Sequence, residues 1–132
     1  MRITLSFALL FAACTLAALP AAYAQDHAAR WAGTWTVEDE SGHGVGFHMT
    51  LKDSGGRITG HVVSPSHDNP IEYAAFKASG DLRIRFENVW RDRADCTFTL
   101  EPGGDALHGT CLHLMHGDEG WRRVNGVREK PE

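Results

Sequence analysis

Hydrophobic and polar residues alternate one for one over much of this chain. The segments 45–52, 58–63 and 82–87 show the period of two most clearly. Such a period is typical of strands that bury one face, in contrast to the three- to four-residue spacing of an amphipathic helix. Glycine-rich turns separate these segments at regular intervals. The pattern predicts eight antiparallel strands, at residues 33–38, 44–52, 57–63, 71–77, 82–89, 94–100, 106–115 and 121–128.

The order of the predicted strands favours a barrel. A sandwich would also fit their spacing, but eight strands joined by consecutive short hairpins can close on themselves and leave no free edge. We therefore predict an all-β fold, an eight-stranded antiparallel up-and-down barrel (a meander), in a single domain of residues 25–132. One helical turn at residues 26–30 is the only helix expected.

Two cysteines test this arrangement, because they flank the turn at residues 102–105. If Glu101 faces Ala106 across that turn, Cys96 falls directly opposite Cys111. Opposed residues of neighbouring strands lie close enough for a disulfide, so we predict a structural Cys96–Cys111 bridge. The same register turns the apolar side chains of both strands to this face, namely Phe98, Leu100 and Leu107.

The phase of the strand after Cys111 is open. Strict alternation turns His113 and Met115 inward and leaves Leu112 and Leu114 outside. Either a β-bulge resets the phase and buries the leucines, or the leucines form an outer apolar patch. Such a patch would join two copies of the chain through the last two strands. We favour the bulge, because an extra residue is common in curved barrel strands.

The first residues of the chain have a different character. A positive start precedes an almost wholly apolar run at residues 4–19, and the small residues Ala22 and Ala24 follow it, three positions and one position before the cleavage site. This pattern predicts a signal peptide of residues 1–24, cleaved between Ala24 and Gln25. The protein would then be periplasmic or secreted, with no transmembrane segment after cleavage. A lipoprotein attached through Cys14 is the less favoured alternative, since the apolar run continues beyond it.

Charge and motifs exclude several classes of function. The chain has 13 Lys and Arg against 17 Asp and Glu, a net charge of -4, which gives no electrostatic basis for binding nucleic acid. It has no Gly-x-Ser-x-Gly elbow, no phosphate loop and no dinucleotide glycine motif. With Cys96 and Cys111 paired, no free thiol nucleophile is left in the mature chain. The sequence therefore predicts no enzyme and no cofactor.

The start of the first predicted strand resembles a known superfamily. Gly33 and Trp35, together with the hairpin at residues 51–60 and its glycine pair, resemble the calycins, the lipocalin-like and avidin-like small bacterial barrels. In such barrels the tryptophan closes one end of the interior and an arginine near the last strand packs over it. Arg122 or Arg123 matches that role by position. The resemblance implies a secreted barrel with an interior cavity.

A cavity of this kind would bind a small, largely apolar molecule by burying it. Biotin is not implied, because Val37 and Val62 stand where the avidin-like site has polar groups. His43 and residues 64–69 would form the mouth. In the alternative interpretation the narrow barrel is filled by its own side chains and acts as an envelope interaction or inhibitor protein. The side chains expected to line the cavity are Trp35, Phe47, Met49, Tyr73, Phe86 and Phe98.

Histidine is the one residue type in excess that a barrel does not explain. The chain has 8, and neutral imidazole is a ligand for zinc and copper. The closest group in the sequence is His108, His113 and His116, which we name as the candidate metal ligands. No His-Glu-x-x-His motif and no His-x-His pair supports them, so metal binding is the third interpretation.

Overall fold

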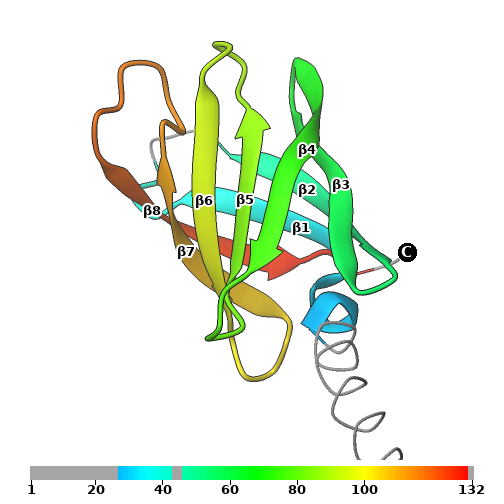
Figure 1. The fold of residues 1–132 in the computed structure, drawn as a ribbon. Helices are drawn as coiled ribbons and strands as arrows, with labels where there is room; N and C mark the ends of the chain where they lie inside the picture. Colours follow the sequence, from blue (N-terminus) through cyan, green and yellow to red (C-terminus); the bar gives the residue numbers. More distant parts are fainter. Residues whose placement is uncertain (1–26, 43–45, 131–132) are drawn as a thin grey trace, which may run out of the picture.

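A computed structural model describes residues 27–42 and 46–130 of the chain. The eight strands close into one antiparallel barrel in which each strand pairs with its neighbours in sequence and β1 pairs with β8 (Figure 1). The predicted fold class is therefore confirmed. The strands are β1 (Gly33–Asp39), β2 (Phe47–Ser54), β3 (Arg57–Ser64), β4 (His67–Phe76), β5 (Leu82–Glu87), β6 (Arg93–Leu100), β7 (Ala106–Leu112) and β8 (Trp121–Arg128).

Some predictions fall on residues that are not described. The signal peptide, its cleavage site between Ala24 and Gln25, Cys14 and His43 all lie there. A helical turn at residues 27–31 precedes β1. Within the described ranges no helix is long and apolar enough to cross a membrane.

The interior of the barrel is filled by side chains from alternate positions of the strands. On β5, for example, Leu82, Ile84 and Phe86 are buried, whereas Arg83 and Arg85 point outward. Full burial of a large apolar side chain contributes about 1.5–3 kcal/mol relative to its exposed state. The alternation that predicts the strands is therefore also what stabilises the closed barrel.

One end of the barrel is closed by the helical turn before β1 and by the end of β8. Trp31 and Trp35 are buried there, and the Trp35 indole nitrogen donates a hydrogen bond to the carbonyl oxygen of Trp31 at 3.0 Å. The guanidinium carbon of Arg128 lies 4.3 Å from the centroid of the Trp35 ring. The predicted arginine over the tryptophan is thus Arg128, and neither Arg122 nor Arg123. β8 starts at the opposite end of the barrel, so only its last residues reach Trp35.

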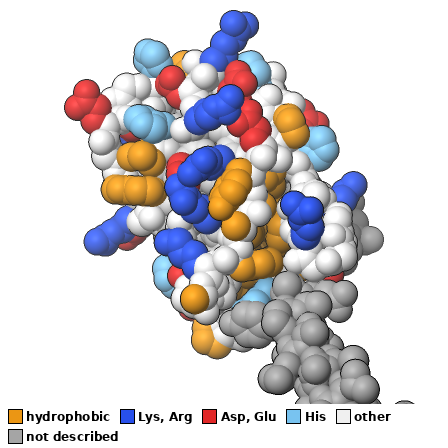
Figure 2. All heavy atoms as spheres, viewed as in Figure 1, with side chains coloured by type: hydrophobic (Ala, Val, Ile, Leu, Met, Phe, Trp, Pro, Cys, Tyr) orange, Lys and Arg blue, Asp and Glu red, His pale blue; other side chains and the backbone are white. Residues whose placement is uncertain are grey.

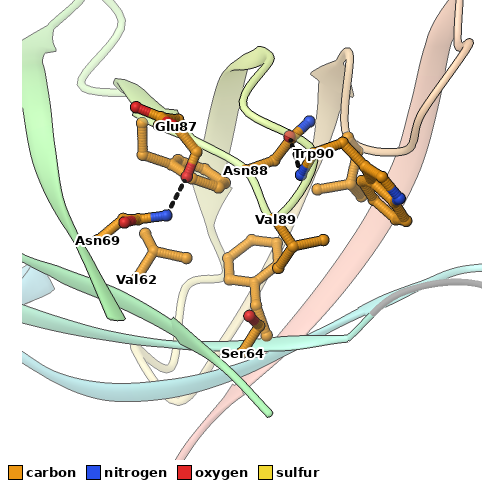
Figure 3. A pocket seen from close by; sticks show the side chains of 10 residues that line it. Val62, Ser64, Asn69, Glu87, Asn88, Val89 and Trp90 are labelled. Atoms are coloured by element: carbon orange, nitrogen blue, oxygen red, sulfur yellow. Dashed lines mark hydrogen bonds between the residues drawn. The ribbon is translucent and has the colours of Figure 1, made fainter. Parts of the chain in front are cut away.

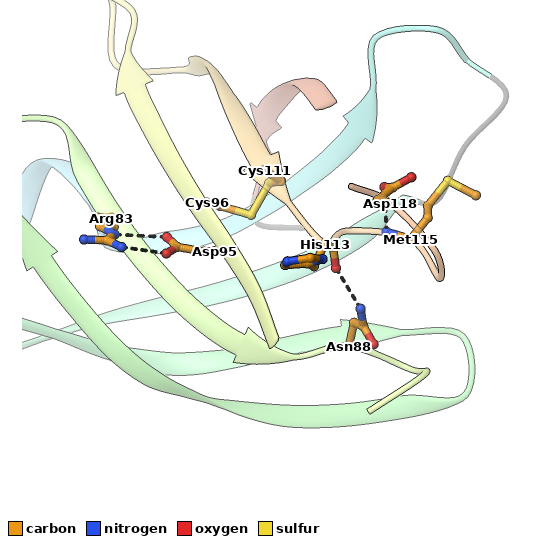
Figure 4. Close-up of a disulfide and its surroundings, with 8 residues drawn as sticks. All are labelled: Arg83, Asn88, Asp95, Cys96, Cys111, His113, Met115 and Asp118. Atoms are coloured by element: carbon orange, nitrogen blue, oxygen red, sulfur yellow. Dashed lines mark hydrogen bonds and ion pairs between the residues drawn. A yellow bond between two sulfur atoms is a disulfide. The ribbon is translucent and has the colours of Figure 1, made fainter. Parts of the chain in front are cut away.

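The predicted register of the cysteine hairpin is confirmed. Cys96 faces Cys111, Phe98 faces Gly109 and Leu100 faces Leu107. A disulfide joins the two cysteines across β6 and β7 (Figure 4). A disulfide is consistent with an oxidising compartment.

After Cys111 the strand ends sooner than predicted. β7 stops at Leu112, and His113 adopts a left-handed conformation with a φ of 56°. This turn resets the phase without a bulge, so Leu114 is buried at 2 % exposure. Leu112 lies on the outer face, paired with Trp121. The alternative that buries the leucines is therefore correct for Leu114, and the alternative that leaves them outside is correct for Leu112.

A bulge does occur, but in β4. The register with β5 shifts between Ile71 and Tyr73, so that Ile71 pairs with Phe86 and Tyr73 pairs with Arg85. One extra residue on a strand turns the following side chain to the opposite face. Tyr73 is consequently outside the barrel, with 43 % of its surface exposed.

Candidate functional site

The end of the barrel opposite Trp35 holds a pocket with a mostly apolar floor. Its floor is the pair of rings of Phe47 and Phe86, whose centroids are 5.4 Å apart. Val62 and Leu114 form its walls, and Trp90 lies at its rim (Figure 3). The cavity measures about 20 Å³, which is room for about one water molecule. We call this region the open end.

Hydrogen bonds within the protein hold the rim of the open end in place. The Asn69 side-chain nitrogen donates to the carbonyl oxygen of Glu87 at 2.7 Å. The Asn88 side-chain nitrogen donates to the carbonyl oxygen of His113 at 2.8 Å, and its oxygen accepts from the backbone nitrogen of Trp90 at 2.9 Å. Asn88 is buried, so these bonds satisfy its polar atoms and join the loop after β5 to the loop after β7.

An ion-pair network also lies at the open end. Arg122, the second residue of β8, donates to Asp118 at 2.6 Å and to Asp39 at 2.7 Å. The Arg122 guanidinium is the main cause that lowers the pKa of Asp118. For Asp39 the hydrogen bond from the Ser41 backbone is the largest cause of the lowered pKa, and Arg122 adds to it. The network ties β1 to the loop that precedes β8.

Two of the side chains predicted to line a cavity do line the open end, namely Phe47 and Phe86. Trp35, Met49 and Phe98 are fully buried in the core, and Tyr73 lies outside. Tyr73 instead contacts the guanidinium of Arg85, whose carbon is 5.0 Å from the ring centroid. The interior that was expected to enclose a ligand is occupied by the protein's own side chains.

Sequence reasoning did not assign six of the residues that line the open end, namely Val62, Glu87, Asn88, Val89, Trp90 and Leu114. The signal for Asn88 is its place directly after a strand, where asparagine often bonds to the backbone two residues on. Its bond to the Trp90 nitrogen is of this kind. The mouth predicted at residues 64–69 is found in part, since Ser64 and Asn69 line the pocket.

The three candidate metal ligands lie apart from one another, each with a different partner. His108 bonds to Glu101 at 2.6 Å on the outer face of β7. His116 lies 3.7 Å from Asp92 and beside the Trp90 ring, while the carbonyl of His113 accepts the Asn88 bond. Across the residues that the structure describes, no three His, Cys, Asp or Glu side chains gather as a metal site.

A scan against protein-family models and a search of curated proteins return no match for this chain. The class is therefore defined by the fold and the closed end. It is a small eight-stranded antiparallel barrel with one disulfide, in which an arginine of the last strand caps a tryptophan of the first. This architecture is compatible with a calycin-like fold.

Proposed function

We propose that this protein is an exported interaction protein that binds a partner protein at its open end. The supporting observation is the filled interior combined with two exposed tryptophans at that end. Trp90 is 39 % exposed in the loop after β5, and Trp121 is 59 % exposed at the start of β8. Exposed tryptophan is costly in water and is enriched among the residues that dominate binding energy in protein interfaces.

The rim holds Trp90 in a fixed arrangement. The Trp90 backbone is bonded to Asn88, and its ring lies 6.3 Å from that of His116. Asn88 also joins the two loops that carry Trp90 and His116. A preorganised rim loses little conformational entropy on association, which favours binding of a partner.

Two features support export as part of this proposal. The sequence predicts a cleaved leader at residues 1–24, and the Cys96–Cys111 disulfide suits an oxidising compartment. A protein of this kind would act in the cell envelope or outside the cell, as an inhibitor or an assembly partner.

Crosslinking of the full chain in its own cell envelope tests the proposal. We expect the wild-type protein to form one crosslinked complex of defined mass with another protein. The variants Trp90→Ser and Trp121→Ser should each lower its yield by at least about tenfold, because a central aromatic contributes about 2 kcal/mol or more to an interface.

Val127→Ser is the matched control, since Val127 is an exposed hydrophobic residue near the end of β8, away from the open end. Its complex should form as in the wild type. Equal yields for the tryptophan variants and the wild type, or no complex with the wild type, would contradict the proposal.

Binding of a small apolar ligand at the open end is the second candidate. The favouring observation is the apolar floor of Phe47 and Phe86 beneath Trp90. Because the cavity admits about one water molecule, a ligand would have to displace Val89 and Trp90. The probe 1-anilinonaphthalene-8-sulfonate would then bind at one site per chain and quench Trp90 fluorescence. Unchanged fluorescence at saturating probe would eliminate this candidate.

A further inference from the structure

Strands β3 and β4 pair over only part of their length. The ladder joins His61 to Pro70 and continues to Ser64 and His67 at the hairpin turn. Beyond this point, residues 57–60 of β3 have no ladder partner in residues 71–76 of β4. Figure 1 shows the two strands diverging away from their connecting turn. Between them runs a groove of about 560 Å³, which we call the β3–β4 groove.

Two backbone features open this groove. If the ladder continued, its next pair would be Gly60 and Ile71. Gly60 has a φ of 150°, and a Cβ atom there would lie 1.8 Å from the carbonyl oxygen of Thr50. Only glycine fits this close approach to β2. The bulge between Ile71 and Tyr73 bends β4 at the same level. Both strands therefore turn away from each other at one point.

The floor of the groove is apolar. Ile58 and Ala74 line it from the two strands, and Ile71 lies beside them. Ile71, Ala74 and Phe76 point inward, yet they are only partly buried, unlike the inward residues of β5. In the space-filling view, hydrophobic side chains are exposed in a band beside β4, with basic side chains on both sides (Figure 2).

The walls of the groove carry positive charge. Arg57 lines the β3 side and forms no ion pair with any residue in the described part of the chain. Beside the β4 wall, the guanidinium of Arg85 packs on Tyr73, and Arg83 and Arg85 share the single carboxylate of Asp95. The carboxylate on this wall, Glu72, is paired with Arg93. The walls therefore complement a negatively charged occupant.

We propose that the β3–β4 groove binds an extended segment of a partner protein in which apolar and acidic residues alternate. The segment adds as a strand to the unpaired edge of β4, where its backbone completes hydrogen bonds that β3 leaves unmade. Its apolar side chains cover Ile71 and Ala74, and its carboxylates meet Arg57 and Arg85. This surface lies on the barrel wall, so it is independent of binding at the open end.

The test uses the full-length mature protein and an acetylated peptide of about seven residues with alternating valine and glutamate. We expect saturable binding by calorimetry. Backbone amide shifts in NMR should change at residues 57–60 and 71–76. A peptide of the same sequence with alternate amides N-methylated should bind at least about tenfold more weakly, because it lacks the donors needed for pairing.

Charge reversal on the protein gives the second arm. Arg57→Glu should weaken binding of the glutamate peptide by about fivefold or more. A peptide of alternating valine and lysine should bind the wild type no better than the glutamate peptide binds Arg57→Glu. Arg123→Glu is the matched control, since it makes the same change on the exposed face of β8 and should leave the affinity unchanged.

Several results would overturn the proposal. They are absence of binding, equal binding of the N-methylated peptide, amide shifts confined to the open end, and equal affinity of Arg57→Glu and wild type. A fifth is a concentration-dependent dimer of the free protein that shifts the same amides, because the groove would then be an interface between two copies of this chain.

Discussion

Gly33 and Arg128 depend on each other at the closed end. Arg128 passes over Trp35 and donates hydrogen bonds to the carbonyl oxygens of Ala32, Arg30 and Gly104. A Cβ atom on Gly33 would lie 2.5 Å from the Arg128 guanidinium, and the φ of Gly33 is 135°. The glycine is therefore required both by its own backbone and by the side chain that crosses it.

Gly33→Ala should destabilise the protein by about 1–3 kcal/mol, because alanine adopts this φ only with strain and displaces Arg128. Urea unfolding followed by tryptophan fluorescence measures the change. Gly103→Ala serves as control, since a Cβ atom there meets nothing within 4 Å. It should change the free energy of unfolding by less than about 0.5 kcal/mol. Equal effects of the two substitutions would refute the pairing of Gly33 with Arg128.

At the open end the Arg122 network makes stability depend on pH. The pKa values of Asp39 and Asp118 are lowered in the folded protein. Between the folded and the unfolded pKa, the unfolded chain binds more protons, so the stabilisation is present above about pH 4 and is lost as the pH falls below that value.

Arg122→Met should lower the melting temperature at pH 7 and flatten the decline of stability below about pH 4. The residual slope comes from the backbone hydrogen bonds to the two carboxylates, which the substitution leaves in place, and from Asp95 and Glu129, whose pKa values are also lowered. Thermal melts at a series of pH values measure both effects. Arg123→Met, an exposed neighbour, should keep the wild-type slope. A slope in Arg122→Met as steep as that of the wild type would show that Arg122 does not hold these carboxylates ionised.

Among the elements, the hairpin of β6 and β7 has its register fixed twice. Its short turn aligns the two strands, and the disulfide joins the paired residues Cys96 and Cys111, which are 15 residues apart. In the chain-entropy description, a crosslink that closes a loop of this length stabilises the folded state by about 3 kcal/mol.

Replacement of both cysteines by alanine should therefore lower the free energy of unfolding by about 3 kcal/mol. Dithiothreitol should lower the melting temperature of the wild type and leave that of the double variant unchanged. A wild-type melting curve that does not respond to reductant would mean that the disulfide contributes nothing to stability.

The comparison of sequence and structure is most instructive at two strands. The start of β7 could be predicted from its turn and its cysteine, but its end could not. The left-handed turn at His113, where the strand stops, is held by a hydrogen bond from distant Asn88. The bulge of β4 could not be predicted, since the residues around Tyr73 allow unbroken alternation. Periodicity reports local burial, whereas both deviations arise from contacts made only in the closed barrel.

The candidate site shows the same division. Phe47 and Phe86 were predicted because they sit at inward positions of regular strands. Trp90 was missed because it lies in a loop, whose position depends on the bond between Asn88 and His113. The burial of Leu114 was expected, but Leu114 lies in the loop after β7 and was not assigned to the site. Strand alternation carries no information about such loops.

For the whole molecule, the filled interior means that the core aromatics serve stability. Phe98→Ala should cost about 3–5 kcal/mol, since it leaves a cavity among fully buried neighbours. Tyr73→Ala removes a ring from the outer face and should cost at most about 1 kcal/mol. Chemical denaturation of both variants provides the comparison. Similar costs would indicate a loosely packed interior able to take up a ligand.

The pairing of β1 with β8 has a consequence for the order of events in folding. It joins residues 35–39 to residues 124–128, so the first and last strands are neighbours although nearly the whole domain separates them in sequence. Such long-range pairing slows folding. The strand that carries Arg128 leaves the ribosome after the seven other strands of the barrel, and until then Trp35 has no cap. The native barrel can therefore close only after β8 has been synthesised.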